Sequence, residues 1–210
     1  MVLSEENTGN IKHVLVVGGG TAGWLSACHL AKKLRAASER GVRVTLVESA
    51  DIPTIGVGEG TVPAIRQSLE YLGIRETDFI RECDATFKQS IKFVDWLHAP
   101  TAGAAVQSNA YHHVFDYPVQ TDIDLTPYWL MGCADGTSYV DSVSVQGQVC
   151  DLGLGPNVMT HAEYDGATNY AYHLDAAKFA KLLTKHGTTV LGVEHKIANV
   201  IDVVVGDDGN

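Results

Sequence analysis

The hydrophobic pattern at the start of the chain predicts a strand, a glycine turn, a helix and a second strand. A β-branched run at residues 12–17 leads directly into the glycines 18–20. Residues 22–36 then repeat apolar side chains at helical spacing and place the charged ones elsewhere. Residues 42–47 form a second apolar run, which ends at Glu48. This order of elements is typical of the opening of a Rossmann-like α/β fold.

After the second strand, the chain is expected to form a loop and then another helix. Residues 51–60 hold too many glycines for the interior of a helix or strand, so they predict an extended loop. Thr61 is the expected N-cap of the next helix, and Pro63 fits its first turn because the missing N–H has no partner there. Apolar residues then recur at helical spacing up to Gly73, where we expect the helix to end.

Residues 86–94 alternate between apolar and polar side chains, as a half-buried strand does. Lys88 is one of its polar positions. From 97 to 170 the pattern is irregular, and short strands such as 139–145 are expected there.

The last part of the chain predicts a helix followed by two strands. Asp175 is the expected N-cap of a helix over 176–186, and Gly187 is expected to end that helix. Strands are expected at 188–193 and 197–205.

Composition favours a folded protein with one substantial domain or two small ones. Of the 210 residues, 45% are hydrophobic, which is enough to build a core. The sequence has no apolar run of the length that a membrane span needs and no signal-peptide pattern, so we expect a cytoplasmic protein. The four cysteines lack C-x-x-C spacing, and we expect them to be buried free thiols in a reduced compartment.

The net charge of −10 is distributed unevenly along the chain. Residues 93–177 contain no lysine or arginine but ten acidic residues, which we interpret as a solvated surface. Nucleic-acid binding depends largely on cationic side chains that neutralise phosphates, so this class of function is disfavoured.

Gly18, Gly20 and Gly23 form a G-x-G-x-x-G fingerprint between the first strand and the first helix. The first glycine permits a tight turn, the second lets a pyrophosphate approach the backbone, and the third lets helix and strand pack closely. The N–H groups that open the helix, at Thr21 and Ala22, are then available to the phosphates. The fingerprint therefore predicts a dinucleotide-binding site.

Glu48 ends the strand that follows the fingerprint helix. An acidic residue in this place accepts hydrogen bonds from the ribose hydroxyls and repels a 2′-phosphate, which argues against NADP. The residues alone leave FAD and NAD as alternatives.

Several segments resemble tryptophan halogenases, in the same order and along nearly the whole chain. Residues 18–24 (GGGTAGW) are similar to the opening of these enzymes. Residues 55–63 (IGVGEGTVP) resemble their GxGEATxP loop, with Gly60 in place of the usual alanine. Residues 87–96 (FKQSIKFVDW) resemble the segment that carries the family's catalytic lysine. Further similar segments are 111–115, 125–130 and 170–175.

The resemblance implies an α/β fold, namely a Rossmann-like FAD-binding domain of the flavin monooxygenase type with an irregular substrate-region insertion. It favours FAD over NAD as the cofactor. Besides the fingerprint and Glu48, it implies that a strap lies over the flavin, formed by Ile55, Gly56, Val57 and Gly58.

The resemblance also implies a reaction. In such enzymes a separate flavin reductase supplies FADH2, and oxygen and a halide, chloride or bromide, then give hypohalous acid. Lys88 matches the lysine that directs this oxidant to one carbon of the substrate ring. His113 and Phe115 match the side chains that sandwich the ring. The implied activity is halogenation of an electron-rich aromatic ring, with tryptophan or another indole as the first expectation.

Some questions stay open at this point. By its periodicity alone, Lys88 is a lysine on the polar face of a strand, and most such lysines point into solvent. The alternatives to a halogenase are a flavin hydroxylase, which is a monooxygenase without halogenation, and a non-catalytic FAD-binding fragment. Lys92 is interpreted as structural or surface-exposed, and the role of Glu59 is open because a carboxylate repels halide. His112 and His113 point to opposite faces of a strand, so we expect no metal site there.

The resemblance divides the chain into three segments. Residues 1–96 would hold the FAD-binding part with the strap and the catalytic-lysine strand, 97–170 a substrate-site insertion, and 171–210 a return to the FAD-binding domain. The family's WxWxIP motif and catalytic glutamate are absent, and Asp207–Asn210 is a hairpin-turn signal without a returning strand. We therefore expect an incomplete chain. Separately, a homodimer is the assembly that we expect for the protein.

Overall fold

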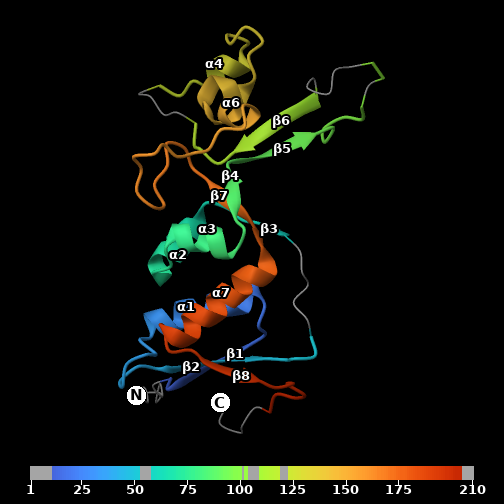
Figure 1. Cartoon of the computed structure of the whole chain (residues 1–210). Helices are drawn as coiled ribbons and strands as arrows, with labels where there is room; N and C mark the ends of the chain where they lie inside the picture. The colour runs from blue at the N-terminus through green and yellow to red at the C-terminus, as the bar shows by residue number, and fades with distance from the viewer. Residues whose placement is uncertain (1–10, 53–57, 101, 104–108, 119–122, 205–210) are drawn as a thin grey trace, which may run out of the picture. The chain divides into compact units, whose positions relative to one another are not determined.

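The computed structural model describes residues 11–52, 58–100, 102–103, 109–118 and 123–204 (Figure 1). The chain forms two compact units, of which the first joins Met1–Val57, Glu82–Asp84 and Asp175–Asn210. The second joins Gly58–Arg81 and Ala85–Leu174. The predicted strap residues Ile55, Gly56 and Val57 and the hairpin signal at 207–210 lie outside the described residues.

The first unit contains a parallel three-stranded sheet with two helices on one side of it (Figure 1). Its strands are β1 (His13–Val17), β2 (Arg43–Glu48) and β8 (Glu194–Ile197), in the order β1-β2-β8. Its helices are α1 (Thr21–Lys33) and α7 (Ala176–Thr189). The predicted order of strand, glycine turn, helix and strand is confirmed.

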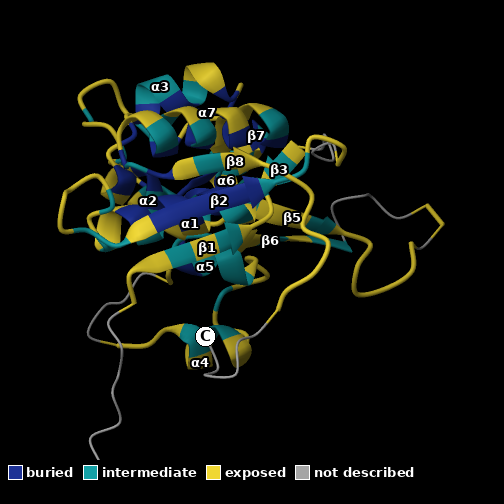
Figure 2. Cartoon of the chain, turned by 90° about the horizontal axis from the view of Figure 1, so that it is seen from below, coloured by how far each residue is buried: buried dark blue, intermediate teal, exposed yellow. Residues whose placement is uncertain are grey.

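The central strand β2 forms the core of this sheet. Val44 and Leu46 are fully buried, and Val47 is nearly so, which Figure 2 shows as a dark-blue strand. Four consecutive buried residues, Val44 to Val47, are typical of a parallel strand that is shielded from solvent on both faces. On the edge strand β1, by contrast, Leu15 and Val17 are exposed.

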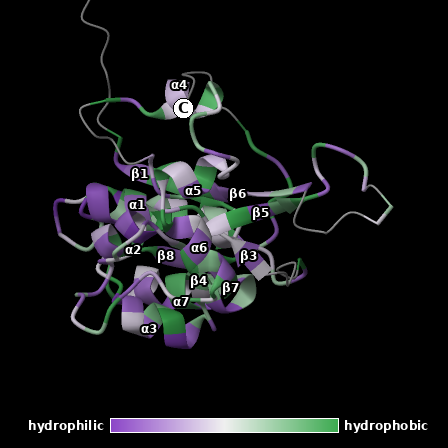
Figure 3. Ribbon diagram, turned by 90° about the horizontal axis from the view of Figure 1, so that it is seen from above, coloured by the Kyte–Doolittle hydropathy of each residue, from purple (hydrophilic) through white to green (hydrophobic). Residues whose placement is uncertain are grey.

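The two helices pack against each other through a glycine. A Cβ atom at Gly187 would lie 3.0 Å from the Cys28 sulfur and 3.2 Å from the Trp24 ring, so α7 approaches α1 closely only without a side chain there. Gly187 was predicted to end the helix, and this is wrong because α7 continues to Thr189. Hydrophobic and hydrophilic residues are mixed along the helices (Figure 3), and the apolar stripe of α7 is buried.

The predicted start of α7 is confirmed, but the strand that follows the helix lies at other residues than predicted. The Asp175 side chain caps the helix by accepting a hydrogen bond from the Lys178 N–H. Because the helix takes up residues that were assigned to a strand, the prediction of strand at 188–193 is wrong. The strand predicted at 197–205 is wrong as well, since β8 ends where that prediction begins.

The second unit begins with a short strand and two helices. They are β3 (Gly58–Gly60), α2 (Ala64–Leu72) and α3 (Glu76–Glu82). Gly73 ends α2 in a left-handed conformation with φ of 85°, as predicted. The helix α3 was not predicted, because its seven residues show only a weak apolar stripe.

Thr61 does not cap α2, contrary to the prediction. Pro63 is the N-cap residue, and no side chain caps the helix. The Thr61 hydroxyl instead donates to the Tyr172 carbonyl at 3.0 Å and accepts from the Tyr172 N–H at 3.0 Å. Thr61 therefore ties the segment after β3 to the neighbouring strand.

The strand predicted at 86–94 is divided between two sheets. β4 (Thr86–Lys88) pairs antiparallel with β7 (Ala171–Asp175), and β3 completes that sheet in the order β3-β7-β4. β5 (Ser90–Val94) pairs antiparallel with β6 (Ala110–Val114). The division falls at Gln89, a buried residue whose amide group bonds the Leu154 carbonyl and the Thr168 hydroxyl.

The irregular region contains the short strand β6, as expected, but its described residues also form three helices that were not expected. They are α4 (Thr126–Leu130), α5 (Tyr139–Val143) and α6 (Gln146–Asp151). The prediction of a strand at 139–145 is wrong, because Ser138 caps α5 by accepting from the Asp141 N–H at 3.1 Å. This local bond favours a helical turn over an extended strand.

The cysteines are all free thiols, but their burial differs. Cys28 and Cys83 are buried, which confirms the prediction for them, and burial raises the pKa of both thiols to about 12. Cys133 is exposed and Cys150 is partly exposed, so for these two the expectation of burial is wrong. In the described ranges, no helix has the length and apolar character needed to cross a membrane.

Candidate functional site

The glycine turn between β1 and α1 has the geometry that its sequence predicts. Gly18 has φ of 112°, which strains any residue with a side chain, and its N–H donates to the Val47 carbonyl at 2.8 Å. A Cβ atom at Gly23 would overlap the Gly18 carbonyl oxygen. The first and third glycines are therefore required by the turn itself and by the packing of the helix on the strand.

The second glycine faces open space at the start of α1. Gly20 is the N-cap residue, no side chain caps the helix, and a Cβ atom at Gly20 would meet nothing within 4 Å. The N–H groups of Thr21, Ala22 and Gly23 have no acceptor within the helix, because they belong to its first turn. A helix start with open N–H groups and no acidic residue in its first turn suits a phosphate.

Glu48 lies directly beside this turn. A Cβ atom at Gly19 would overlap the Glu48 carboxylate, so this carboxylate is held against the glycine backbone. Its other oxygen makes a 2.6 Å hydrogen bond with His195 Nε2, and the His195 ring contacts Trp24 edge-on at 5.0 Å. The side chain of Glu48 is 25% exposed and therefore still accessible to a ligand.

His195 is a residue of this site that the sequence did not indicate. It lies on β8, opposite Leu46 of β2, and the predicted strands at 188–193 and 197–205 both left it out. Together the glycine turn, the open helix start and the Glu48 carboxylate fit the pyrophosphate and ribose of a dinucleotide. They contain no group that would be specific for flavin.

Lys88 lies at the end of β4 in the second unit and is partly buried. Its Nζ atom donates to the Thr61 carbonyl at 3.0 Å and lies 5.4 Å from the centre of the Phe115 ring. An ammonium group has three N–H donors, so further donors remain for other partners. This environment differs from that of a lysine that points into bulk solvent.

Lys88 also borders a cavity of about 400 Å³. Gln89 and Ser90 continue along its wall from Lys88, and His173 of β7 contributes a second nitrogen-bearing side chain. The remaining lining residues are Phe87, Cys150, Gly153, Leu154 and Gly155. The cavity has room for a small molecule beside the lysine.

The structure brings Phe115 to Lys88 but leaves His113 apart. The Phe115 N–H donates to the Gln89 carbonyl at 3.1 Å and to Gln146 Oε1 at 2.7 Å, so buried Gln146 fixes the backbone there. His113 is exposed and lies opposite Ile91 in the β5–β6 ribbon. No contact between His113 and Lys88 is present among the described residues.

One buried carboxylate, hydrogen-bonded to three tyrosines, lies beside the strand pair that carries Lys88. Glu76 is 5% exposed and accepts hydrogen bonds from the hydroxyls of Tyr170 at 2.7 Å and Tyr172 at 2.5 Å, and from the Tyr164 N–H at 2.6 Å. Burial, together with the nearby Glu76 carboxylate, raises the pKa of all three tyrosine hydroxyls. The Phe87 ring packs edge-on against Tyr170 at 5.2 Å.

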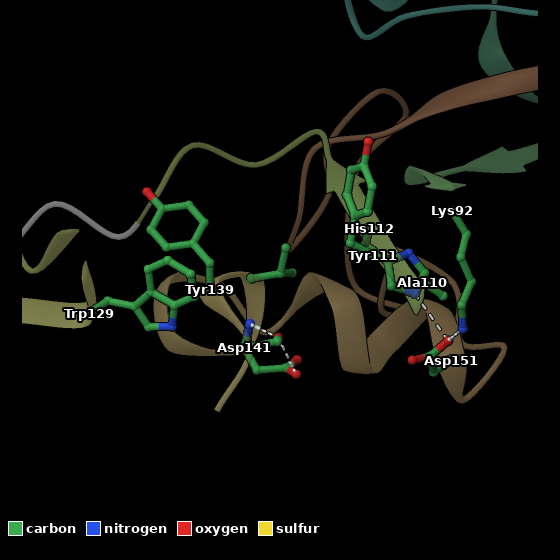
Figure 4. A pocket seen from close by; sticks show the side chains of 10 residues that line it. Lys92, Ala110, Tyr111, His112, Trp129, Tyr139, Asp141 and Asp151 are labelled. Atoms are coloured by element: carbon green, nitrogen blue, oxygen red, sulfur yellow. Dashed lines mark hydrogen bonds and ion pairs between the residues drawn. The ribbon is translucent and has the colours of Figure 1, made fainter. Parts of the chain in front are cut away.

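A second cavity, of about 560 Å³, lies in the same unit (Figure 4). One wall carries His112, which bonds Ser90 Oγ at 2.9 Å and Asp151 at 3.1 Å, and Lys92, which pairs with Asp151 at 2.6 Å. The hydrogen bond from Lys92 and then the one from His112 lower the pKa of Asp151. Lys92 is thus engaged in an exposed ion pair, in agreement with its interpretation as a structural or surface residue. The rings of Trp129 and Tyr139 form another wall.

Comparisons with known proteins all lead to the same family. A family model described as tryptophan halogenase matches residues 13–210. The tryptophan 6-halogenase ThaL of Streptomyces albogriseolus is 33% identical, over 95% of this chain and 38% of its own length. The tryptophan 7-halogenase RebH of Lentzea aerocolonigenes is 32% identical, over 97% of this chain and 39% of its own length.

Solved structures agree with these relatives. The crystal structure of a tryptophan halogenase from Shewanella frigidimarina has a TM-score of 0.87 and 42% identity, and the match covers 95% of this chain and 38% of that one. The tryptophan 6-halogenase SttH from Streptomyces toxytricini has a TM-score of 0.76 and 34% identity. The chain spans less than half the length of these relatives.

Proposed function

Because the chain belongs to the tryptophan halogenase family, we propose that the protein takes part in the FADH2-dependent halogenation of an electron-rich aromatic ring. The observation that carries this proposal is the placement of Lys88, which borders a cavity and has its Nζ atom 5.4 Å from the centre of the Phe115 ring, instead of pointing into bulk solvent. The curated relatives are named tryptophan 6- and 7-halogenases, which favours tryptophan or another indole as the substrate.

FAD is the cofactor in this proposal. The pyrophosphate would lie at the open start of α1, where Gly18, Gly20, Thr21, Ala22 and Gly23 surround it, and the adenosine ribose would bond Glu48. Gly58, together with Ile55, Gly56 and Val57, would form the strap over the flavin. Bound FADH2 supplies the chemistry that turns oxygen and halide into hypohalous acid.

Lys88 can direct the hypohalous acid in either of two ways. Its ammonium group donates a hydrogen bond to the oxygen of hypohalous acid and orients the halogen. Its neutral amine can instead attack the halogen, which forms a nitrogen–halogen bond and releases water. A carbon of the aromatic ring next takes the halogen and loses a proton, and the lysine amine is restored. Either course places the electrophilic halogen at a fixed point.

The substrate ring is assigned to the side of the cavity near Phe115. A flat side chain holds an aromatic ring by stacking. Lys88 Nζ lies 5.4 Å from the centre of the Phe115 ring, so a substrate ring stacked on Phe115 would lie close to the ammonium. His113 is assigned to the other side of the substrate, on the basis of the family resemblance. Residues 97–170 would in this way contribute to the substrate site, together with the catalytic-lysine strand of 1–96, whereas the rest of 1–96 and 171–210 would belong to the FAD-binding part.

The proposal extends to the partners of the protein. A separate flavin reductase would supply FADH2, a halide ion, chloride or bromide, would be the co-substrate, and the reaction would take place in the cytoplasm. A homodimer is the assembly that we propose.

The test is a reaction with and without halide. The full-length protein that carries this sequence is supplied with FAD, a flavin reductase, NADH, oxygen and tryptophan or simple indoles, in chloride, in bromide and without halide. We expect products with the halogen mass and isotope pattern only when halide is present. A hydroxylated product that forms without halide would replace this proposal with a flavin hydroxylase, and flavin binding without conversion of any aromatic compound would leave a non-catalytic FAD-binding protein.

A further inference from the structure

Two nitrogen atoms of the second unit approach the same point beside β3. A Cβ atom added to Gly60 would lie 3.2 Å from Lys88 Nζ and 3.3 Å from His173 Nδ1. Both distances are shorter than ordinary van der Waals contact, so a side chain at position 60 would press on both groups. The bare backbone of Gly60 is therefore what leaves room for the two side chains together.

The strand register explains this approach. In the antiparallel pair of β4 and β7, Thr86 lies opposite His173 and Lys88 lies opposite Ala171. Side chains two residues apart on a strand share a face, so Lys88 and His173 are diagonal neighbours on one face of the sheet. Both side chains line the cavity of about 400 Å³.

The hydrogen-bonding capacity of the two groups is complementary. Lys88 uses one N–H of its ammonium group for the Thr61 carbonyl at 3.0 Å, and the centre of the Phe115 ring lies 5.4 Å from its Nζ atom. A neutral imidazole carries one acceptor nitrogen, and His173 Nδ1 is the imidazole nitrogen nearest to the point that Lys88 also approaches. An additional acceptor would restrict the rotation of the long lysine side chain, which loses much rotamer freedom when it is held.

We propose that His173 is a positioning residue for Lys88, and that Gly60 makes this role possible. A small rotation of the Lys88 side chain lets Nζ donate to His173 Nδ1 as well as to the Thr61 carbonyl. The remaining N–H, or the lone pair of the neutral amine, then points into the cavity. A Cβ atom at position 60 would contact both groups and keep them further apart. The inference rests on the proposed role of Lys88.

The test compares two replacements of His173 in the full-length protein. His173→Leu removes the acceptor and keeps a side chain of similar bulk, whereas His173→Asn keeps a polar atom near the position of Nδ1. His98→Leu, at an exposed histidine outside the cavity, is the matched control. The halogenated product formed per FADH2 consumed is measured together with the KM for the aromatic substrate.

A second readout follows the lysine without any reaction turnover. The protein is treated with an amine-acylating reagent, and the labelling rates of Lys88 and Lys92 are compared by peptide mass spectrometry. Lys92 serves as the internal reference because its ion-pair partner is Asp151 and not His173. General loosening of the fold would change both rates, but loss of a partner for Lys88 would change only one.

We expect His173→Leu to lower the product per FADH2 about tenfold, as the loss of a hydrogen bond to a charged group does, with the substrate KM unchanged. Labelling of Lys88 should become faster while that of Lys92 stays constant. His173→Asn should restore most of the yield, and His98→Leu should match the parent.

Two results would overturn the inference. One is a parental yield and parental Lys88 labelling in His173→Leu, and the other is equal impairment of the Leu and Asn variants. Lys88→Ala is measured beside them. If Lys88→Ala is inactive and His173→Leu is normal, the inference alone fails. If Lys88→Ala halogenates normally, the proposed role of Lys88 is wrong, and the inference about His173 is wrong with it.

Discussion

The glycine turn permits a test that separates cofactor binding from folding. Gly20→Ala and Gly23→Ala each add one methyl group to the same fingerprint, at positions with opposite surroundings. At Gly20 the methyl would meet nothing within 4 Å, and the backbone, with φ of −73°, is one that alanine adopts readily. At Gly23 the methyl would overlap the Gly18 carbonyl oxygen.

The expected magnitudes follow from these contacts. Gly20→Ala should change the free energy of unfolding of the flavin-free protein by no more than about 0.5 kcal/mol, because the new methyl touches nothing. It should nevertheless weaken FAD at least about tenfold, because it occupies the space that a pyrophosphate needs. Gly23→Ala should cost about 1–3 kcal/mol of stability, as overpacking does, and should weaken FAD as well.

Two measurements separate the effect on folding from the effect on FAD binding for each variant. Thermal or urea unfolding without FAD gives the stability, and a fluorescence titration with FAD gives the affinity. If Gly20→Ala bound FAD as tightly as the parent, the pyrophosphate would not lie at this turn. If Gly23→Ala were as stable as the parent, the close approach of α1 to β1 would not matter for the fold.

Three further predictions concern other parts of the chain. Glu48→Ala should weaken FAD in the same titration, since it removes the ribose acceptor, and unchanged affinity would place the ribose elsewhere. Glu76→Leu should destabilise the protein by about 3–5 kcal/mol in urea unfolding, because it leaves buried donors without an acceptor, and Glu76→Gln should cost clearly less; equal costs would show that the hydrogen bonds are unimportant. Phe115→Ala should broaden the pattern of halogenated regioisomers seen by mass spectrometry and NMR, and an unaltered pattern with unaltered substrate binding would place the ring elsewhere.

The elements set by local chemistry could be predicted from the sequence. The glycine turn and the strands and helix around it depend on short-range patterns, and Asp175 caps α7 as its sequence position suggests. Gly73 likewise ends α2 through its own backbone freedom. These features need no knowledge of distant residues.

The errors arose where a distant partner decides the structure. Thr61 is a residue type that often caps helices, but its hydroxyl is hydrogen-bonded to the backbone of Tyr172. Residues 86–94 alternate as one strand, yet buried Gln89 divides them between two sheets. Gly187 looks like a helix end, although it is required by the packing of α7 on α1.

The candidate site shows the same limit. Its principal lysine was found through a resemblance, because periodicity alone describes Lys88 as a surface residue. Neither the approach of His195 to Glu48 nor that of His173 to Lys88 could be predicted from the sequence, since both pairs depend on strand register across long separations. Residues that act together through register are visible only once the sheet is built.

The most direct test of the central claim is the product formed by Lys88→Ala in the full-length protein that carries this sequence. Halogenated product, FADH2 consumption and oxygen consumption are measured together, with Lys88→Arg alongside because a permanently protonated guanidinium cannot form a haloamine. We predict that both variants bind FAD and consume FADH2 and oxygen at close to the parental rate, while halogenated product falls to a trace. Halogenation by Lys88→Ala at near-parental rate and regioselectivity would contradict the account.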